Sequence, residues 1–210
     1  RMKETGLWPE SIYIGGGTPT TLSSEQLDDL LQFVEDSIDL SRNIEFTVEA
    51  GRADTITAEK LKAIKRHGVD RISINPQSMK KKTLELIGRS HEPKDIIEAF
   101  QAAHQVEIPV INADVIAGLP EETPDDFAGT LESILKLEPE NITVHTLAVK
   151  RASRLVELDK DYHYKHAECV KEMLDISRNV LAQAGFGPYY LYRQKHMAGA
   201  MENVGYCRDN

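Results

Sequence analysis

The stretch RISINPQ (residues 71–77) alternates apolar and polar side chains, and this alternation decides the fold class. Side chains alternate between the two faces of a β-strand, so Ile72 and Ile74 share one face, opposite Ser73 and Asn75. A strand covered by helices on both faces would instead be apolar throughout. The stretch is therefore predicted to form a strand with one buried face and one polar face.

Similar runs rich in β-branched residues recur along the chain. They are SIYIGG (11–16), IEFTVEA (44–50), VINADVIAGLP (110–120) and NITVHTLAV (141–149). The runs start roughly thirty to forty residues apart with helical patterns between them, which is typical of β-α-β units and a parallel sheet. Each run after the first has one apolar and one polar face. This pattern predicts a barrel-like sheet, helix-covered outside and polar inside, with a site at the carboxyl ends of the strands.

Capping residues mark several of the helices. Ser23 and Gln26 have the spacing of a capping box, and Thr57 can cap the next helix. Thr123 followed by Pro124 predicts another helix start. A long helix is expected over about 161–184, ending at a glycine, followed by a last strand in PYYLYRQKH (188–196). Without a linker or low-complexity segment, residues 1–210 are predicted to form one core domain.

Composition limits the functional class. The 210 residues carry a formal net charge of −9, which argues against a protein that holds nucleic acid through its phosphates. No stretch has the apolar length of a membrane span or the pattern of a signal peptide, so a cytoplasmic location without membrane partners is expected. The chain starts with Arg1 and ends with GYCRDN, so we expect a piece of a longer protein, truncated at both ends.

The glycine run in GGGTPT (15–20) follows the first predicted strand. Three glycines carry an entropic cost, so a ligand or a tight turn is expected to need the bare backbone. The run lacks G-x-G-x-x-G and Gly-Lys-Ser/Thr, and Pro19 intervenes before the helix, so it does not fit a phosphate-binding loop.

Polar side chains should converge at the carboxyl ends of the strands. Glu49, Gln77 and Asp114 could together hold the vicinal hydroxyls of a ribose, since ionised carboxylates accept two hydrogen bonds. Asn75 and His145 should lie at the same edge. Two alternatives stay open: each acid could pair with a buried Arg or Lys, or the two acids could act as the acid and base of a sugar-phosphate-type barrel enzyme.

Two further patterns favour structural interpretations. His163-x-x-His166-x-x-Cys169 would turn the third side chain away from the first on a helix, so a solvated helix face is preferred and no metal site is predicted. The aromatics of PYYLYRQK favour a packed strand over a ligand platform.

An ordered set of motifs resembles a known family. GGGTPT after a strand, VEAGR, RISINPQ, IGRSH and INADVIAGLP follow one another at the family's spacing. In this order they resemble the radical S-adenosylmethionine enzymes related to oxygen-independent coproporphyrinogen III oxidase, and most closely their bacterial coproporphyrinogen dehydrogenase branch. The resemblance covers nearly the whole chain, although NPQ stands where better-known members have GVQ.

The resemblance implies a fold and a cofactor site. The fold would be the partial (β/α)6 TIM-like barrel of radical S-adenosylmethionine enzymes, here without its first strand. The glycine run would meet the amino-acid end of S-adenosylmethionine. The implied cofactor-binding positions are Gly15, Gly16, Gly17, Thr18, Glu49, Gln77, Arg89, Asp114 and Ala148.

The resemblance also implies an activity. The intact protein would use S-adenosylmethionine and a 4Fe–4S cluster to convert propionates of coproporphyrinogen III to vinyl groups, with an electron donor such as flavodoxin or ferredoxin. The family's three cluster cysteines would precede residue 1, since Cys169 and Cys207 lack the spacing, so this piece alone is expected to be inactive. Some relatives are haem chaperones, which leaves a haem-binding or haem-trafficking role as the alternative.

Overall fold

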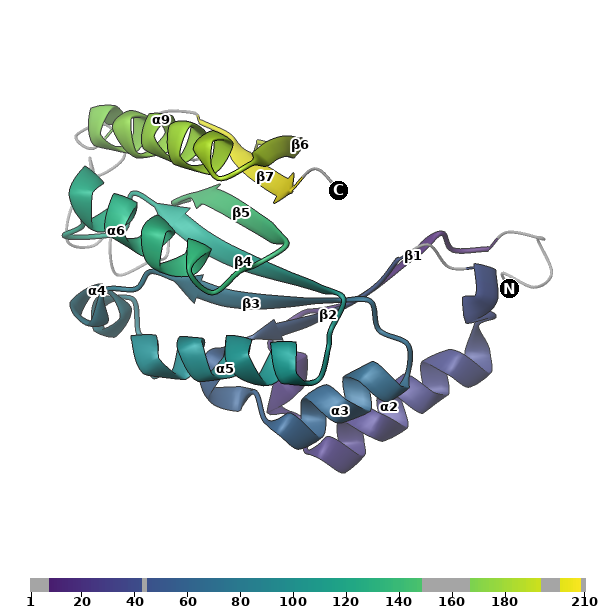
Figure 1. Cartoon of the computed structure of the whole chain (residues 1–210). Coiled ribbons are helices and arrows are strands. Elements are labelled where there is room, and N and C mark those ends of the chain that lie inside the picture. Colours follow the sequence, from purple (N-terminus) through teal and green to yellow (C-terminus); the bar gives the residue numbers. More distant parts are fainter. Residues whose placement is uncertain (1–7, 43–44, 149–166, 194–200, 209–210) are drawn as a thin grey trace. The chain divides into compact units, whose positions relative to one another are not determined.

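The computed structural model describes residues 8–42, 45–148, 167–193 and 201–208, and strands alternate with helices along most of them (Figure 1). The strands are β1 (Ser11–Ile14), β2 (Glu45–Gly51), β3 (Arg71–Gln77), β4 (Val110–Ala117), β5 (Asn141–Thr146), β6 (Phe186–Tyr192) and β7 (Asn203–Arg208). The α-helices are α2 (Ser24–Ser37), α3 (Ala58–Arg66), α4 (Lys81–Leu86), α5 (Pro93–Gln105), α6 (Pro124–Leu135) and α9 (Ala167–Gln183). Short 3-10 helices are η1 (Pro19–Thr21), η2 (Leu40–Arg42) and η3 (Ala53–Thr55). The predicted β-α succession is confirmed.

The strands of the described chain form a mixed sheet in the order β1-β2-β3-β4-β5-β7-β6. β1 pairs with β2, and β2 with β3, in parallel, as the repeated β-α units predict. A bulge between Glu49 and Gly51 interrupts the second pairing. β7 pairs antiparallel with both β5 and β6. The sequence did not predict β7, whose six residues lie between two strands that precede it in the chain.

Contacts divide the chain into two compact units. The first unit comprises Arg1–Asn75 and Lys94–Asn112, and the second comprises Pro76–Pro93 and Ala113–Asn210. The first therefore contains β1, β2, most of β3, the start of β4, α2, α3 and α5, and the second contains the rest of β4, β5, β6, β7, α4, α6 and α9. Each unit is described below by itself, and the expectation of one core domain stays a prediction.

The alternation read from the sequence is visible in the burial of each strand. The apolar residues on the helix-covered faces of the four central strands are 0–1% exposed; these residues are Phe46, Val48, Ile72, Ile74, Ile111, Ala113, Val115, Ile142 and Val144. In the first unit Leu27, Leu61 and Phe100 of its three helices are fully buried as well. The burial of these side chains supplies the main driving force for the fold.

The helix starts agree with the sequence. Ser23 accepts a hydrogen bond from the Gln26 N–H, and the Gln26 side chain accepts one from the Ser23 N–H, which completes a capping box on α2. Thr57 caps α3, and Thr123 caps α6. The described part of the predicted long helix is α9, followed by Gly185 at φ +81°. Residues 161–166 of that prediction lie outside the described residues.

β6 (Phe186–Tyr192) confirms the strand predicted over 188–196, while positions 194–196 lie outside the described residues. The prediction that this strand is the last was wrong, because β7 follows it. Its side chains are not packed as expected: Tyr189 is 49% exposed, Leu191 65% and Tyr192 46%. The reason is the position of β6 at one end of the strand order, where it pairs with β7. An edge strand lacks a sheet neighbour on its outer side, so its residues bury less surface.

In the first unit, a buried network fastens the segment after the glycine turn to β2 and η3. The Thr20 hydroxyl donates to the Ala50 carbonyl at 2.5 Å and lies 2.6 Å from the Thr55 hydroxyl. Lys60 Nζ donates to the carbonyls of Thr20 and Thr55 at 2.5 and 3.0 Å. Thr20 is fully buried, so these hydrogen bonds are shielded from water.

In the second unit, the turn after β3 is fastened to the start of α6. The Met79 N–H donates to Thr130 Oγ1 at 3.2 Å, and Lys80 Nζ lies 2.6 Å from Asp126 Oδ2. Lys80, and then the backbone of Thr123, hold the pKa of the Asp126 carboxyl at about 2, below its usual 3.8. Asp126 is thus a charged anchor for both the turn and the helix cap.

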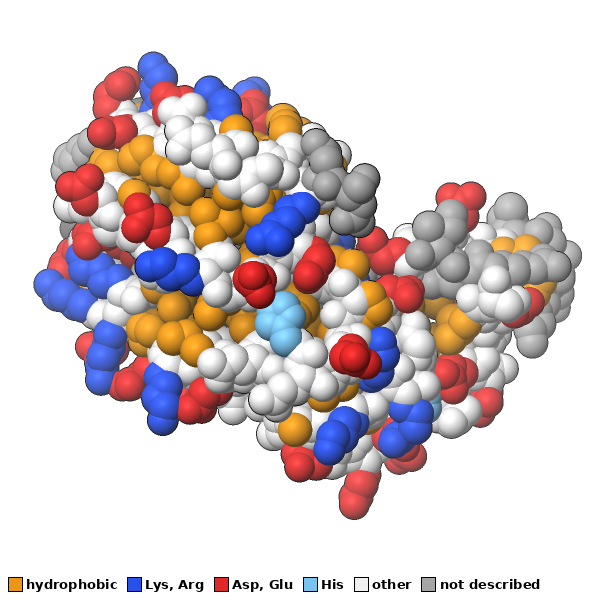
Figure 2. Space-filling view, in the orientation of Figure 1, with side chains coloured by type: hydrophobic (Ala, Val, Ile, Leu, Met, Phe, Trp, Pro, Cys, Tyr) orange, Lys and Arg blue, Asp and Glu red, His pale blue; other side chains and the backbone are white. Residues whose placement is uncertain are grey.

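The helices carry a mixed charged surface. On the face shown in Figure 2, acidic and basic side chains are interspersed around small hydrophobic areas. Exposed pairs such as Lys94 and Glu98 on α5, 3.2 Å apart, contribute little stability because water screens them. Within the described residues, no helix combines the length and the apolar character needed to cross a membrane.

The two adjacent threonines of η1 provide a matched test of the buried network. Thr20→Val keeps the shape of the side chain but leaves the buried Ala50 carbonyl without its hydroxyl donor, so the free energy of unfolding should fall by about 1–3 kcal/mol. Thr21→Val removes an exposed hydrogen bond to the Thr18 carbonyl, which water can replace, and should change it by less than about 0.5 kcal/mol. Urea unfolding followed by circular dichroism measures both values. Equal losses in the two variants would contradict the assignment.

The Asp126 anchor predicts an acid-dependent loss of stability. A lowered carboxyl pKa stabilises the fold above the unfolded-state value and loses this contribution as pH falls from 3.8 through about 2. We expect the stability difference between the wild type and Asp126→Asn, about 1 kcal/mol after allowance for partial exposure, to shrink over that interval. Urea unfolding at a series of pH values measures it. Asp125→Asn, a change at an exposed carboxyl on the same helical turn, should follow the wild type, and a similar profile for Asp126→Asn would refute the anchor.

Candidate functional site

The glycine turn and Glu49 lie against each other in the first unit. The turn follows β1, and Gly16 and Gly17 adopt φ values of +88° and +74°, which favour glycine. A Cβ atom added at Gly15 would lie 2.3 Å from Tyr13 Cε1 and 2.8 Å from Glu49 Oε2, closer than such atoms approach. The bare backbone at position 15 thus lets both the Tyr13 ring and the Glu49 carboxylate approach the turn. The structure brings these predicted site residues together.

Thr18 lies at the end of this turn, against the last residue of β2. Gly51 has φ +63°, and a Cβ atom there would lie 3.0 Å from Thr18 Cγ2. The Thr18 carbonyl accepts hydrogen bonds from the N–H and the hydroxyl of Thr21, at 2.9 and 2.7 Å. The conformation of the glycine turn is therefore fixed at its end by both η1 and β2.

A row of side-chain hydrogen bonds crosses three strands of the first unit and ends at Glu49. Asn112 Nδ2 donates to Ser73 Oγ at 2.7 Å, and the Ser73 hydroxyl donates to Asn75 Oδ1 at 3.3 Å. Asn75 Nδ2 then donates to Glu49 Oε1 at 3.4 Å, a long hydrogen bond. Asn112, Ser73 and Asn75 are 2%, 6% and 8% exposed, whereas Glu49 is only half-buried. The buried polar face thus presents one carboxylate at its accessible end.

The hydrogen bond from Asn75 tests the alternative that Glu49 only stabilises the fold by pairing with a buried Arg or Lys. A buried carboxylate that only stabilises the fold would need a cation beside it. Among the described residues, Glu49 forms no ion pair with Lys or Arg, and an amide holds it instead. The carboxylate therefore has capacity left to accept hydrogen bonds from a ligand.

In the second unit, two predicted residues meet on neighbouring strands. Asp114 Oδ1 of β4 lies 3.6 Å from His145 Nε2 of β5, and their side chains are 17% and 37% exposed. Gln77 ends β3 with φ +66°, in the left-handed region that residues with a Cβ rarely adopt. Its side chain is 6% exposed, and in the described chain its Oε1 has no hydrogen-bond partner. A buried amide oxygen without a donor is costly, so it marks Gln77 as a place where a donor is expected.

Arg89 and Ala148 owe their rank in the predicted site chiefly to the resemblance. Arg89 follows α4, is half-buried, and donates its N–H to the Leu84 carbonyl at 2.9 Å. Ala148 follows β5 and is half-buried as well. The preceding Leu147 N–H donates to the Ala117 carbonyl at 2.9 Å, which fixes this segment beside β4. The roles of both residues stay predictions.

The residues of the chain fit S-adenosylmethionine better than they fit an iron–sulfur cluster. In the first unit, the bare glycine turn and the half-buried Glu49 carboxylate are groups that an amino acid or a ribose can meet. The same holds in the second unit for the Gln77 amide oxygen, which lacks a partner among the described residues. A 4Fe–4S cluster needs several cysteine thiolates, and the sequence has only Cys169 and Cys207. Both are free thiols, and no cluster of His, Cys, Asp and Glu suited to a metal occurs among the described residues.

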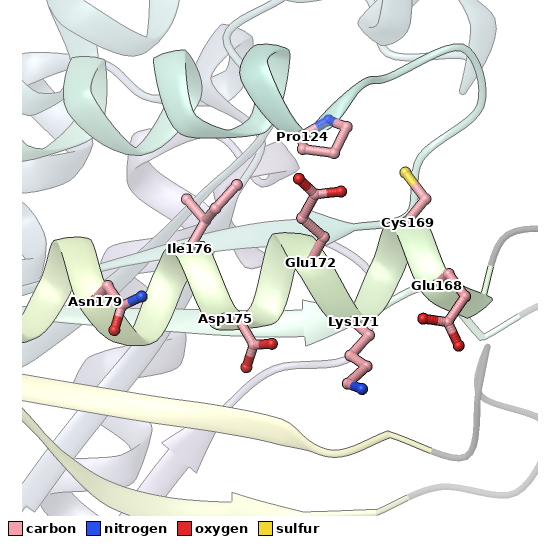
Figure 3. Close-up of a pocket in the computed structure, with 8 residues that line it drawn as sticks. All are labelled: Pro124, Glu168, Cys169, Lys171, Glu172, Asp175, Ile176 and Asn179. Atoms are coloured by element: carbon pink, nitrogen blue, oxygen red, sulfur yellow. The ribbon is translucent and has the colours of Figure 1, made fainter.

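A separate cavity of about 520 Å³ lies along α9, near Pro124 at the start of α6 (Figure 3). Its lining includes Glu168, Cys169, Lys171 and Glu172 but none of the predicted site residues. Burial, and then Glu172, raise the pKa of the Cys169 thiol, which makes it a weaker nucleophile and metal ligand. The cavity is therefore not assigned to the site. His163 and His166, the partners of Cys169 in the sequence pattern, lie outside the described residues.

The structure adds polar residues that the sequence did not single out as a site. Ser73 and Asn112 were expected on the polar face, but their hydrogen-bonded row toward Glu49 was not. Ser78 and Glu122, both buried and hydrogen-bonded to each other, gave no signal because they lie in loops after β3 and β4. Strand periodicity does not extend to such positions.

Comparison with known proteins places this geometry in a family. Residues 2–134 match the Radical SAM superfamily. The oxygen-independent coproporphyrinogen-III oxidase-like protein HemZ of Bacillus subtilis is 44% identical over 206 residues, 98% of this chain and 41% of the relative. The heme chaperone HemW of the same organism is 34% identical over 183 residues, 86% of this chain and 48% of the relative. The chain thus spans less than half the length of these relatives.

A solved structure supports the fold. Coproporphyrinogen III oxidase (HemN) from Escherichia coli superposes with a TM-score of 0.73 at 22% identity, over 95% of this chain and 43% of that one. This likeness confirms the predicted partial TIM-like α/β fold. Together with the family match over residues 2–134, it identifies the chain as a member of the radical S-adenosylmethionine superfamily, among proteins similar to oxygen-independent coproporphyrinogen oxidase.

Proposed function

We propose that the intact protein is a radical S-adenosylmethionine enzyme that oxidatively decarboxylates propionate side chains of coproporphyrinogen III to vinyl groups. The observation that carries the proposal is the 44% identity, over 98% of this chain, to a protein named for its likeness to that oxidase. Each propionate would lose carbon dioxide, one hydrogen atom and one electron, the electron passing to an external acceptor. The family membership argues against the sugar-phosphate-type alternative.

The role of this chain in that reaction is to bind and orient S-adenosylmethionine. The glycine turn at Gly15 would offer backbone groups to its amino-acid end, beside the Glu49 carboxylate. Gln77 would donate or accept hydrogen bonds at the ribose, and the Asp114 carboxylate would accept them. When bound beside a reduced 4Fe–4S cluster, S-adenosylmethionine supplies the one-electron chemistry that removes a hydrogen atom from the substrate.

The proposal assigns the remaining parts to the longer protein. The cluster ligands would lie outside these 210 residues, since the two cysteines present cannot supply them. An electron donor such as flavodoxin or ferredoxin would reduce the cluster in the cytoplasm. Substrate contacts would come partly from the portion of the relatives' length that this chain does not span.

The decisive experiment is an anaerobic turnover assay of the intact protein with a reconstituted cluster, S-adenosylmethionine, a reductant and coproporphyrinogen III. We expect vinyl products and carbon dioxide, detected by liquid chromatography with mass spectrometry. A protein heated before the assay controls for spontaneous oxidation. Absence of vinyl product from a protein with an intact cluster would overturn the oxidase proposal.

A haem-chaperone function is the second candidate, and one observation favours it. The heme chaperone HemW of Bacillus subtilis matches 86% of this chain at 34% identity. This alternative expects stable haem binding by the intact protein and no decarboxylation. Absorption spectroscopy of the purified protein titrated with haem distinguishes it from the oxidase.

The Glu49 carboxylate gives a residue-level prediction. Glu49→Gln removes the charge beside the glycine turn while keeping its size, so the dissociation constant for S-adenosylmethionine should rise by about tenfold or more, as expected for loss of a charged hydrogen-bond partner. Isothermal titration calorimetry of the intact anaerobic protein measures it. Glu10→Gln, at an exposed carboxylate just before β1, is the matched control and should bind as the wild type does. Unchanged affinity in Glu49→Gln would remove Glu49 from the site.

A further inference from the structure

The backbone of Gln77 is held in a conformation that its own residue type disfavours. Its φ is +66°, although it has a Cβ atom and is followed by Ser78 rather than by a glycine. The side chain is 6% exposed, and among the described residues its Oε1 lacks a hydrogen-bond partner. Such a conformation persists only where the surrounding structure imposes it. The contacts of the next residues show what does so.

Ser78 connects this turn to a buried carboxyl group. The Lys80 N–H donates to Ser78 Oγ at 3.0 Å, so the hydroxyl uses one lone pair as an acceptor. The Ser78 hydroxyl proton is directed to Glu122 Oε1. Ser78 is fully buried and Glu122 is 7% exposed, which shields both hydrogen bonds from water. Two consecutive hydrogen bonds therefore connect the backbone of the turn, at the Lys80 N–H, to Glu122.

Glu122, the partner of Ser78, is an ionisable residue at a buried position. Burial raises the pKa of its carboxyl, against the opposite influence of the Ser78 and Thr83 hydroxyls and, more weakly, of Lys80. Burying an ionisable group destabilises the fold at neutral pH relative to an uncharged group of the same size. Lys80 does not neutralise it directly, because its Nζ lies 2.6 Å from Asp126 Oδ2. What Glu122 offers the turn is a buried hydrogen-bond acceptor for the Ser78 hydroxyl.

We propose that Glu122 is a positioning residue for Gln77: through Ser78 it holds the turn 77–80 so that the Gln77 carboxamide is presented to S-adenosylmethionine. This inference rests on the proposed function, since it gives Gln77 that ligand. Glu122 itself does not touch the ligand. It acts through the hydroxyl of Ser78 on the backbone that follows Gln77.

Two replacements of similar size separate positioning from stability. Glu122→Gln keeps an oxygen that accepts the Ser78 hydroxyl, and Glu122→Met does not. Both remove the buried ionisable group, but Glu122→Met also leaves the buried Ser78 hydroxyl without its acceptor, so we expect a lower melting temperature for Glu122→Met and not for Glu122→Gln. Binding is therefore measured well below both melting temperatures, where each variant is folded. The dissociation constant for S-adenosylmethionine, measured calorimetrically on the intact anaerobic protein, should stay within about threefold for Glu122→Gln and rise about tenfold for Glu122→Met. Glu121→Gln, at the exposed neighbouring carboxylate, should bind as the wild type does.

A double-mutant cycle tests whether the effect passes through Gln77. Gln77→Ala alone should weaken binding about as much as Glu122→Met, and the two together should weaken it little more than either alone. Multiplied losses in the double variant, or equal affinities of the Gln and Met variants, would overturn the proposal.

Hydrogen exchange distinguishes failure of this inference from failure of the proposed function. The Lys80 amide should exchange faster in Glu122→Met and at the wild-type rate in Glu122→Gln. If the wild type does not bind S-adenosylmethionine, the proposed function and the ligand named here both fail, and the exchange rates still decide whether Glu122 holds the turn. If the wild type binds and the Lys80 amide is equally protected in all variants, the positioning role alone is refuted.

Discussion

The candidate site depends on one constraint: buried polar side chains of the central strands need hydrogen-bond partners, and where the described residues supply none, as at Gln77 Oε1, a ligand is expected to do so. The opposite faces are wholly occupied by apolar residues such as Val48, Ile72 and Ile111, which are 0% exposed. The polar residues are therefore confined to one face, where most are buried as well. In the first unit these side chains form one row of hydrogen bonds. Each member donates to the next, from Asn112 through Ser73 and Asn75 to Glu49. The row ends at a carboxylate, so acceptor capacity is left at its end.

Much of the fold could be predicted from the sequence because local signals determine it. The alternation in residues 71–77 and the capping residues Ser23, Thr57 and Thr123 act within a few positions, and the structure has the corresponding strand and helices. β7 could not be predicted, because its partners β5 and β6 are specified by tertiary packing rather than by its six residues. The exposure of Tyr189 likewise follows from the strand order and not from its local sequence.

Fewer of the candidate site residues than of the strands and helices could be predicted from local sequence patterns. The alternating polarity of the strands was enough to bring Glu49 and Asp114 into consideration, whereas Arg89 and Ala148 gained their rank from the family resemblance. The left-handed backbone of Gln77 had no sequence signal, since glycine or asparagine would be the usual residue there. Glu122 was missed because the loop after β4 has no periodicity from which burial could be read. A residue such as Glu122, which is proposed to act through the contacts of another residue, therefore gives no signal in the local sequence pattern.

The position of β7 has a consequence for the order in which the protein folds. β7 lies between β5 and β6 in the sheet but is the last of the described strands in the chain. During synthesis, β6 leaves the ribosome before β7, the strand with which it pairs. Until β7 has been made, the segment that carries the exposed tyrosines and Leu191 has no partner strand there. The Phe186–Tyr192 segment can therefore join the sheet only after Asn203–Arg208 has been synthesised, because Asn203–Arg208 lies between it and β5. A nascent chain that stalls between these two strands would expose an aromatic, unpaired strand to other chains.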